Sequence, residues 1–163
     1  MNVRPADDPG LADEIALRRL AEDYARCADR VDGDGLAALF VHDGVIRIIT
    51  PDGVTSRELV GRARIADAIT RLDRYVATMH VVANHYADVH GDIANAEVYC
   101  HAHHLVPAAG ERAAHDHVMM IRYRDRCRRE PGGWRFVERV VHVAWTAEHT
   151  VTASPPARPG RPT

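Results

Sequence analysis

The stretch MHVVANHYADVHGDIANAEVYCHAHH, residues 79–104, decides the fold that we predict for this chain. It covers most of two runs rich in β-branched and aromatic residues, 78–89 and 94–106, which are separated by His90-Gly91-Asp92. A short polar segment with a central glycine favours a chain reversal. The two runs are therefore predicted to be antiparallel neighbours in a β-sheet.

Two further β-rich runs follow at 114–126 and 134–147. The segments that precede them, 107–110 and Pro131-Gly132-Gly133, also contain the residues that turns require. Consecutive strands joined by short reversals form a meander. The second half of the chain thus predicts a four-stranded antiparallel sheet.

The first half of the chain predicts helices and one hairpin. Apolar residues between 11 and 31 fall on one side of a 3.6-residue wheel and arginines on the other, which indicates an amphipathic helix that Gly33 and Gly35 interrupt. A short helix at 36–40 and a third helix at 62–75 flank a β-hairpin formed by 45–49 and 55–59.

Helices followed by a meander indicate an α+β fold. In such a fold the sheet curls and the helices cover its concave face. We therefore expect the N-terminal helices to pack on a curved, mostly antiparallel sheet that encloses an apolar pocket.

The composition indicates one globular domain, which we place at 11–148, with flexible tails at 1–10 and 149–163. The chain has 163 residues and a formal net charge of -2, so no basic surface predicts nucleic acid or an anionic membrane as a partner. The three cysteines form no metal or disulfide motif, and no signal peptide or membrane span is expected. We expect a cytoplasmic protein with a small-molecule partner.

The chain contains 11 histidines, most of them in the predicted strands. Because side chains alternate across a strand, Tyr99, His101 and His103 share one face of their strand, and His80 shares a face with Asn84 on the preceding strand. A neutral imidazole exchanges a proton near neutral pH, and a neighbouring carboxylate orients it. Some of these histidines are therefore candidates for a general base.

Asp29 and Asp32, near the end of the first predicted helix, are the nearest candidates for that carboxylate. An ideal helical wheel puts Asp32 closer to the apolar face than Asp29, but Gly33 makes the extension of the wheel unreliable. Periodicity leaves the choice between them open.

Three segments together resemble the SnoaL-like branch of the nuclear-transport-factor-2-like superfamily: YARCADRVDGDGLAALFVHDG at 24–44, the quoted stretch at 79–104, and RYRDRCRREPGGWRFVERVVHVAW at 122–145. The resemblance covers about residues 11–148. That superfamily includes scytalone dehydratase, ketosteroid isomerase and lindane dehydrochlorinase. It implies an α+β cone, often dimeric.

The resemblance implies a catalytic pair of Asp29 and His80. It also implies a second histidine on the next strand, for which we favour His103 over His101. Expected contacts to substrate come from five further positions: Tyr24, Asn84, Tyr99, His101 and Met119. We expect Arg139, Trp134 and Trp145 to belong to the framework.

These residues predict a cofactor-independent lyase, first of all a dehydratase, or an isomerase. Its substrate is expected to be small, mostly apolar and oxygenated, such as a polyketide, terpenoid or steroid. Polyketide cyclisation, epoxide hydrolysis and a non-catalytic binding protein are alternatives. A metal-dependent oxygenase is disfavoured because the HAHH tract at 101–104 lacks the glutamate spacing of a cupin site. No cofactor or metal is expected, and the resemblance predicts a homodimer or higher homo-oligomer.

Overall fold

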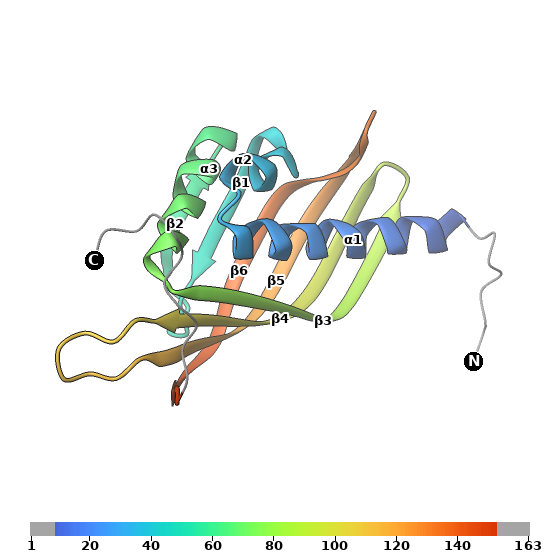
Figure 1. Ribbon diagram of the computed structural model, residues 1–163. Helices are drawn as coiled ribbons and strands as arrows, with labels where there is room; N and C mark the ends of the chain where they lie inside the picture. The colour runs from blue at the N-terminus through green and yellow to red at the C-terminus, as the bar shows by residue number, and fades with distance from the viewer. Residues whose placement is uncertain (1–8, 153–163) are drawn as a thin grey trace, which may run out of the picture.

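The structure, a computed structural model, describes residues 9–152. Three α-helices, one 3-10 helix and six strands follow one another within this part of the chain (Figure 1): α1 (Pro9–Arg30), α2 (Gly33–Ala38), β1 (Phe40–Ile49), β2 (Thr55–Val60), α3 (Arg62–Thr70), η1 (Arg71–Arg74), β3 (Ala77–His90), β4 (Ile93–Val106), β5 (His115–Glu130) and β6 (Gly133–Thr150). Most of the two expected tails lies outside the described residues. Helix α1 begins before the expected boundary at 11, and β6 ends after 148.

The six strands form one curved sheet in the order β2-β1-β6-β5-β4-β3. Strands β3 to β6 form the predicted antiparallel meander, and β1 joins its far edge by pairing parallel to β6. Helix α1 crosses the concave face of the sheet, and α2 and α3 lie together at the end that carries β1 and β2 (Figure 1). The α+β class is confirmed.

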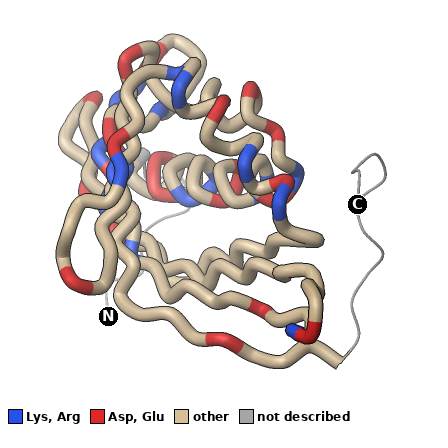
Figure 2. The backbone as a smooth tube through the Cα atoms, turned by 90° about the vertical axis from the view of Figure 1, so that its left-hand side faces the viewer, with Lys and Arg blue, Asp and Glu red and all other residues tan. Residues whose placement is uncertain are grey.

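Helix α1 packs on the sheet through the apolar stripe that its sequence predicts. Leu17, Leu20, Ala21, Tyr24 and Ala28 are at most 7% exposed. The opposite face carries exposed charged residues such as Arg18, Arg19 and Arg26, and the blue and red segments in Figure 2 mark the charged residues along the helix. Burial of this stripe, rather than intrinsic helix propensity, positions α1 over the sheet.

The end of α1 turns the two candidate aspartates toward different partners. Val31 adopts a positive φ of 56°, which terminates the helix. Asp32 is the N-cap of α2, where its carboxylate accepts a hydrogen bond from the Gly35 amide at 2.8 Å. Asp29, one turn earlier, faces β3 instead.

A buried ion pair lies at the centre of the core. Arg139 of β6 donates two hydrogen bonds to Asp125 of β5, at 2.8 and 2.6 Å. Its guanidinium also lies 4.2 Å from the ring centroids of Tyr24, Tyr123 and Phe136. The expected role of Arg139 as a framework ion-pair partner is confirmed.

An irregularity in β3 changes which side chains face the cavity. The pairing of β3 with β4 shifts register between Val82 and His85. Thr78, His80 and Val82 point inward before the shift, and His85 points inward after it, while Asn84 is exposed. The expected shared face of His80 and Asn84 is therefore wrong, because a bulge adds a residue to the strand and breaks the alternation.

None of the helices in residues 9–152 is long and apolar enough to span a membrane. The three cysteines are unpaired, and Cys100 and Cys127 are buried as small apolar side chains.

Candidate active site

A cavity of about 340 Å³ opens between the concave face of the sheet and the segment α3–η1. This size is at the lower end of small-molecule pockets, which measure roughly 300–1,000 Å³. Its wall is largely apolar and is contributed by Ile46, Ile48, Leu59, Ile69, Leu72, Met119, Ile121 and Val141. Tyrosines 24, 75 and 123 and histidines 80 and 104 supply uncharged polar groups to it.

Asp29 and His80 form a hydrogen-bonded pair at the wall of this cavity. The Asp29 Oδ1 atom lies 2.7 Å from Nδ1 of His80 and accepts a hydrogen bond from the Thr78 hydroxyl at 3.0 Å. Its Oδ2 atom accepts a hydrogen bond from the His80 backbone amide at 3.0 Å. Three donors from one strand thus hold the carboxylate behind the imidazole, and the His80 ring lines the cavity.

The charges of this pair follow from its contacts. Burial alone would raise the pKa of the Asp29 carboxyl, but the hydrogen bonds from His80 and Thr78 outweigh burial and lower the pKa below its ordinary value of 3.8. Asp29 is therefore ionised at neutral pH. A carboxylate only accepts, so Nδ1 of His80 carries the proton and Nε2 presents its lone pair to the cavity.

His104 is the second imidazole in the cavity, and it is only 5% exposed. Burial, with a smaller effect of the nearby His80, lowers the pKa of His104 to about 4. Its Nδ1 atom lies 3.3 Å from the His117 carbonyl oxygen, which can only accept a hydrogen bond. His104 is therefore neutral at pH 7, donates through Nδ1, and has Nε2 as an acceptor.

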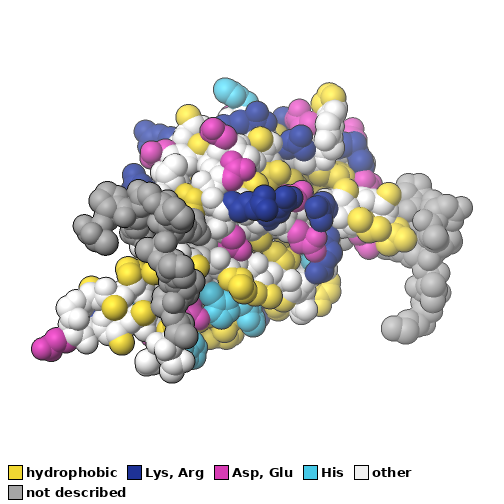
Figure 3. Space-filling view, viewed as in Figure 1, with side chains coloured by type: hydrophobic (Ala, Val, Ile, Leu, Met, Phe, Trp, Pro, Cys, Tyr) yellow, Lys and Arg dark blue, Asp and Glu magenta, His cyan; other side chains and the backbone are white. Residues whose placement is uncertain are grey.

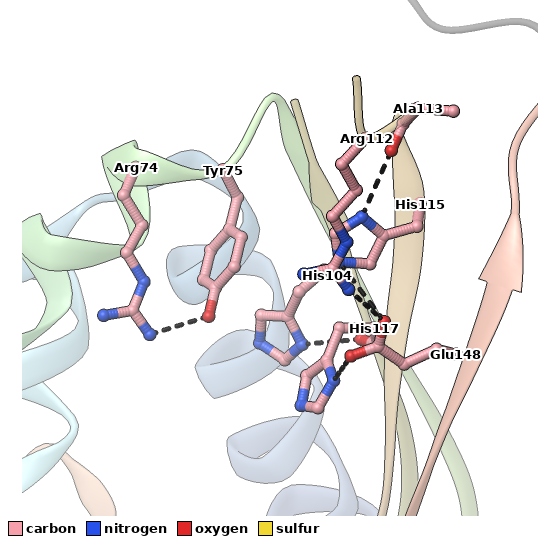
Figure 4. Close-up of polar contacts among 8 residues, drawn as sticks. All are labelled: Arg74, Tyr75, His104, Arg112, Ala113, His115, His117 and Glu148. Atoms are coloured by element: carbon pink, nitrogen blue, oxygen red, sulfur yellow. Dashed lines mark hydrogen bonds and ion pairs between the residues drawn. The ribbon is translucent and has the colours of Figure 1, made fainter. Parts of the chain in front are cut away.

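Tyr75 lies between Arg74 and His104 (Figure 4). Its hydroxyl oxygen accepts a hydrogen bond from Arg74 at 2.6 Å, and its ring centroid lies 4.8 Å from that of His104. The hydroxyl proton of Tyr75 is not used in this contact. Tyr75 can thus donate a hydrogen bond to an oxygen in the cavity while Arg74 holds its hydroxyl oxygen.

Polar residues continue from His104 to the surface at the ends of β5 and β6 (Figure 4). His117 lies next to His104, with ring centroids 6.2 Å apart, and contacts Glu148 at 3.4 Å. Glu148 also accepts a hydrogen bond from Arg112 at 2.6 Å and lies 3.4 Å from His115. This network supports the strand that carries His117.

The structure places two of the five expected substrate contacts, Tyr24 and Met119, in the cavity wall. Asn84 is exposed because of the bulge in β3. Tyr99, His101 and His103 lie on the outer face of β4, where Tyr99 stacks under Arg122 and His103 bonds to Asp116 at 2.7 Å. The expected cavity positions of these four residues are corrected accordingly.

Tyr99, His101 and His103 face outward because of the composition of the two faces of β4. Ala94, Val98, Cys100 and Ala102 are completely buried and share the alternation of His104. The other face carries Asn95, Glu97, Tyr99, His101 and His103. The apolar face must pack against the core, and His104 lies on that face. His104 therefore also points inward.

Sequence reasoning therefore missed His104 and Tyr75. His104 could have been found from the sequence, because it continues the alternation of the small apolar residues that precede it on β4. Tyr75 had no such signal, because it follows a helix end and its direction depends on η1. The histidine-rich tract does not assemble a metal site: among residues 9–152 no three His, Cys, Asp or Glu side chains are grouped so that they could hold an ion.

The sequence and the fold were compared with those of known proteins. Residues 9–140 match the model of the SnoaL-like domain family. No curated protein matches the sequence.

Three solved structures illustrate the similarity in fold. A candidate scytalone dehydratase from Novosphingobium aromaticivorans is 24% identical, with a TM-score of 0.73 and coverage of 96% of this chain and 99% of that one. A hexachlorocyclohexane dehydrochlorinase is 17% identical, with a TM-score of 0.72 and coverage of 93% and 97%. An NTF2-like protein with a cystatin-like fold, also from N. aromaticivorans, is 26% identical, with a TM-score of 0.66 and coverage of 85% and 92%.

Proposed function

Because this chain belongs to the SnoaL-like domain family, we propose that it is an acid–base enzyme that eliminates water from a small, mostly apolar, oxygenated molecule. The observation that carries the proposal is the Asp29–His80 pair, which directs the Nε2 lone pair of a buried imidazole into an apolar cavity. Two solved structures of similar fold are named as a dehydratase and a dehydrochlorinase, and both names denote eliminations.

In the first step, Nε2 of His80 removes a proton from the carbon next to a substrate carbonyl. The electrons of the broken C–H bond form an enolate, and the negative charge develops on the carbonyl oxygen. Asp29 stabilises the imidazolium that results, because its carboxylate accepts the hydrogen bond from Nδ1–H throughout. Tyr75 donates a hydrogen bond to the developing oxyanion, with Arg74 behind its hydroxyl.

In the second step, the enolate collapses to a carbon–carbon double bond and the C–O bond to the β-hydroxyl breaks. The proton held by His80 moves to that hydroxyl, so water leaves and His80 returns to its neutral form. One base therefore serves both proton transfers. His104 is neutral at pH 7 and accepts a hydrogen bond through Nε2, which suits it to orient the substrate hydroxyl before it leaves.

The cavity wall contributes by excluding bulk water. Its apolar residues lower the local dielectric, which strengthens the attraction between Asp29 and the protonated His80. The same groups would also support isomerisation, in which the proton returns to carbon. Dehydration is the first expectation because both His80 and His104 are available to the leaving hydroxyl.

A panel of cyclic β-hydroxy ketones tests the proposal, with loss of water followed by mass spectrometry. At least one compound is expected to be dehydrated. His80→Ala and Asp29→Asn should each lower kcat by about a hundredfold or more without changing the circular dichroism spectrum.

A matched control lies on the same strand. Asp88 and His90 form an exposed pair at 3.1 Å, so the double variant Asp88→Asn/His90→Ala removes the same groups away from the cavity. It should keep full activity. Full activity of His80→Ala would reject the mechanism, and a protein that binds panel compounds without converting any would instead be a binding protein.

A further inference from the structure

The charged residues of the cavity wall are all of one sign. Arg57, Arg71 and Arg74 line it, and no Asp or Glu among the described residues does. The chain as a whole has a formal net charge of -2, so a basic protein surface does not explain this excess. The carboxylate of Asp29 lies behind His80 and is bound by three donors.

Among the described residues, carboxylates engage the three arginines weakly or not at all. Within residues 9–152, Arg57 and Arg74 have no carboxylate partner, and Arg74 contacts only Tyr75. Arg71 lies 3.6 Å from Asp67, and both side chains are mostly exposed. Such a pair contributes little and leaves the guanidinium available to a ligand.

The arginines and the apolar wall lie at different depths. Arg57 comes from β2, and Arg71 and Arg74 come from η1; all three are exposed and so lie where the cavity meets solvent. Ile46, Ile69 and Ile121 are at most 8% exposed and form the deep part of the wall. A ligand that fills this cavity therefore contacts apolar side chains at one end and guanidinium groups at the other.

We infer that the substrate is an amphipathic carboxylate, whose apolar ring body fills the deep cavity while its carboxylate binds Arg57, Arg71 and Arg74 at the mouth. Guanidinium groups suit this task, because their planar N–H donors match the two oxygens of a carboxylate. The inference rests on the proposed function for the site and names the substrate class that the site selects. It changes the expected substrate from a mostly apolar molecule to an organic acid.

Binding of two probes tests this inference independently of turnover. 2-Naphthoate and 2-naphthylmethanol share a ring system and differ mainly in charge, and their affinities are measured by calorimetry. Naphthoate is expected to bind about tenfold more tightly at low salt, since three exposed charge contacts contribute modestly each. The preference should decrease as salt is added, because ions screen exposed charges.

The variant Arg57→Gln/Arg71→Gln/Arg74→Gln should abolish the preference. The control Arg19→Gln/Arg64→Gln/Arg122→Gln removes the same three charges from exposed positions outside the cavity and should retain it. Equal affinity for the two probes, no binding of naphthoate, or equal loss in both triple variants would overturn the inference.

The variant His80→Ala separates this inference from the proposed chemistry. It lacks the base but keeps the arginines, so it should still prefer naphthoate. A wild type that prefers naphthoate but dehydrates no compound would reject the catalytic proposal alone. A wild type that dehydrates a compound but binds both probes equally would reject the anion site alone.

Discussion

The imidazole ring of His104 lies edge-on to that of His80, with ring centroids 5.6 Å apart and an interplanar angle of 82°. Two imidazoles this close in an apolar cavity cannot both carry a proton without repulsion. His104 is the more deeply buried of the two residues, and burial lowers its pKa to about 4. The proposed mechanism therefore assigns the role of base to His80, which has the carboxylate partner.

The lowered pKa of His104 predicts a pH-dependent stability. Folded His104 binds a proton only near pH 4, whereas the unfolded residue binds it near 6.5. Between these values the unfolded chain holds more protons, so the free energy of unfolding falls as pH drops from 6.5 to 4. The loss due to His104 should approach about 3 kcal/mol.

Urea unfolding of the wild type and of His104→Gln at several pH values measures this effect. The variant should lose less stability than the wild type over the window and should match its slope above pH 6.5. His90→Gln, at an exposed position, should behave as the wild type. Parallel curves for wild type and His104→Gln would contradict the pKa assigned to the buried ring.

Tyr75→Phe should lower kcat on the order of a hundredfold with a small change in KM, because the hydroxyl stabilises charge that develops only in the transition state. Tyr86→Phe is the matched control, since Tyr86 lies on β3 with 61% of its surface exposed. Steady-state kinetics on a compound that the wild type dehydrates provides the measurement. A change confined to KM would show that Tyr75 only binds the substrate.

Asp125→Asn should destabilise the fold by about 3–5 kcal/mol, because Arg139 would then be a buried charge without a counter-ion. Replacing both partners by Asp125→Leu/Arg139→Met should restore most of that loss. The exposed pair of Arg128 and Glu130 provides the comparison, and Glu130→Gln should change stability by less than about 1 kcal/mol. Chemical denaturation measures all three, and a double variant no more stable than Asp125→Asn would contradict this account.

The outer face of the sheet is predicted to carry the homodimer contact. One row of paired residues crosses four strands, from Val81 through His101 and Met120 to Trp145. Trp145 and Val81 are 57% and 45% exposed, which is unusual for side chains of this size. Figure 3 views the opposite side of the molecule, which carries α1, and there apolar and histidine side chains lie close together in the lower part of the view.

Light scattering after gel filtration should show a dimer for the wild type and a monomer for Trp145→Asp. The variant Val54→Asp changes an exposed apolar residue in the loop between β1 and β2 and should remain dimeric. A monomeric wild type at all concentrations would contradict the prediction.

Local sequence patterns were sufficient to predict the order and type of nearly every helix and strand. The turn predicted at His90-Gly91-Asp92 is present, with Gly91 at a φ of 60° that favours glycine. The predicted helix at 62–75 divides into α3 and η1, so its last turn is tighter than expected. This difference matters because Arg71, Arg74 and Tyr75 take their directions from that turn.

The sequence by itself determined the α+β arrangement, since the first half shows helical apolar periodicity around one hairpin and the second half shows that of strands. It also determined which residues of β4 share a face, because alternation along a strand is a property of the backbone. Only the tertiary structure decided which of those faces turns inward, where the bulge in β3 shifts the alternation, and which aspartate meets His80. These outcomes depend on contacts between segments far apart in the chain, as when burial of Ala102 and Cys100 beneath the helices brings His104, rather than His103, into the cavity.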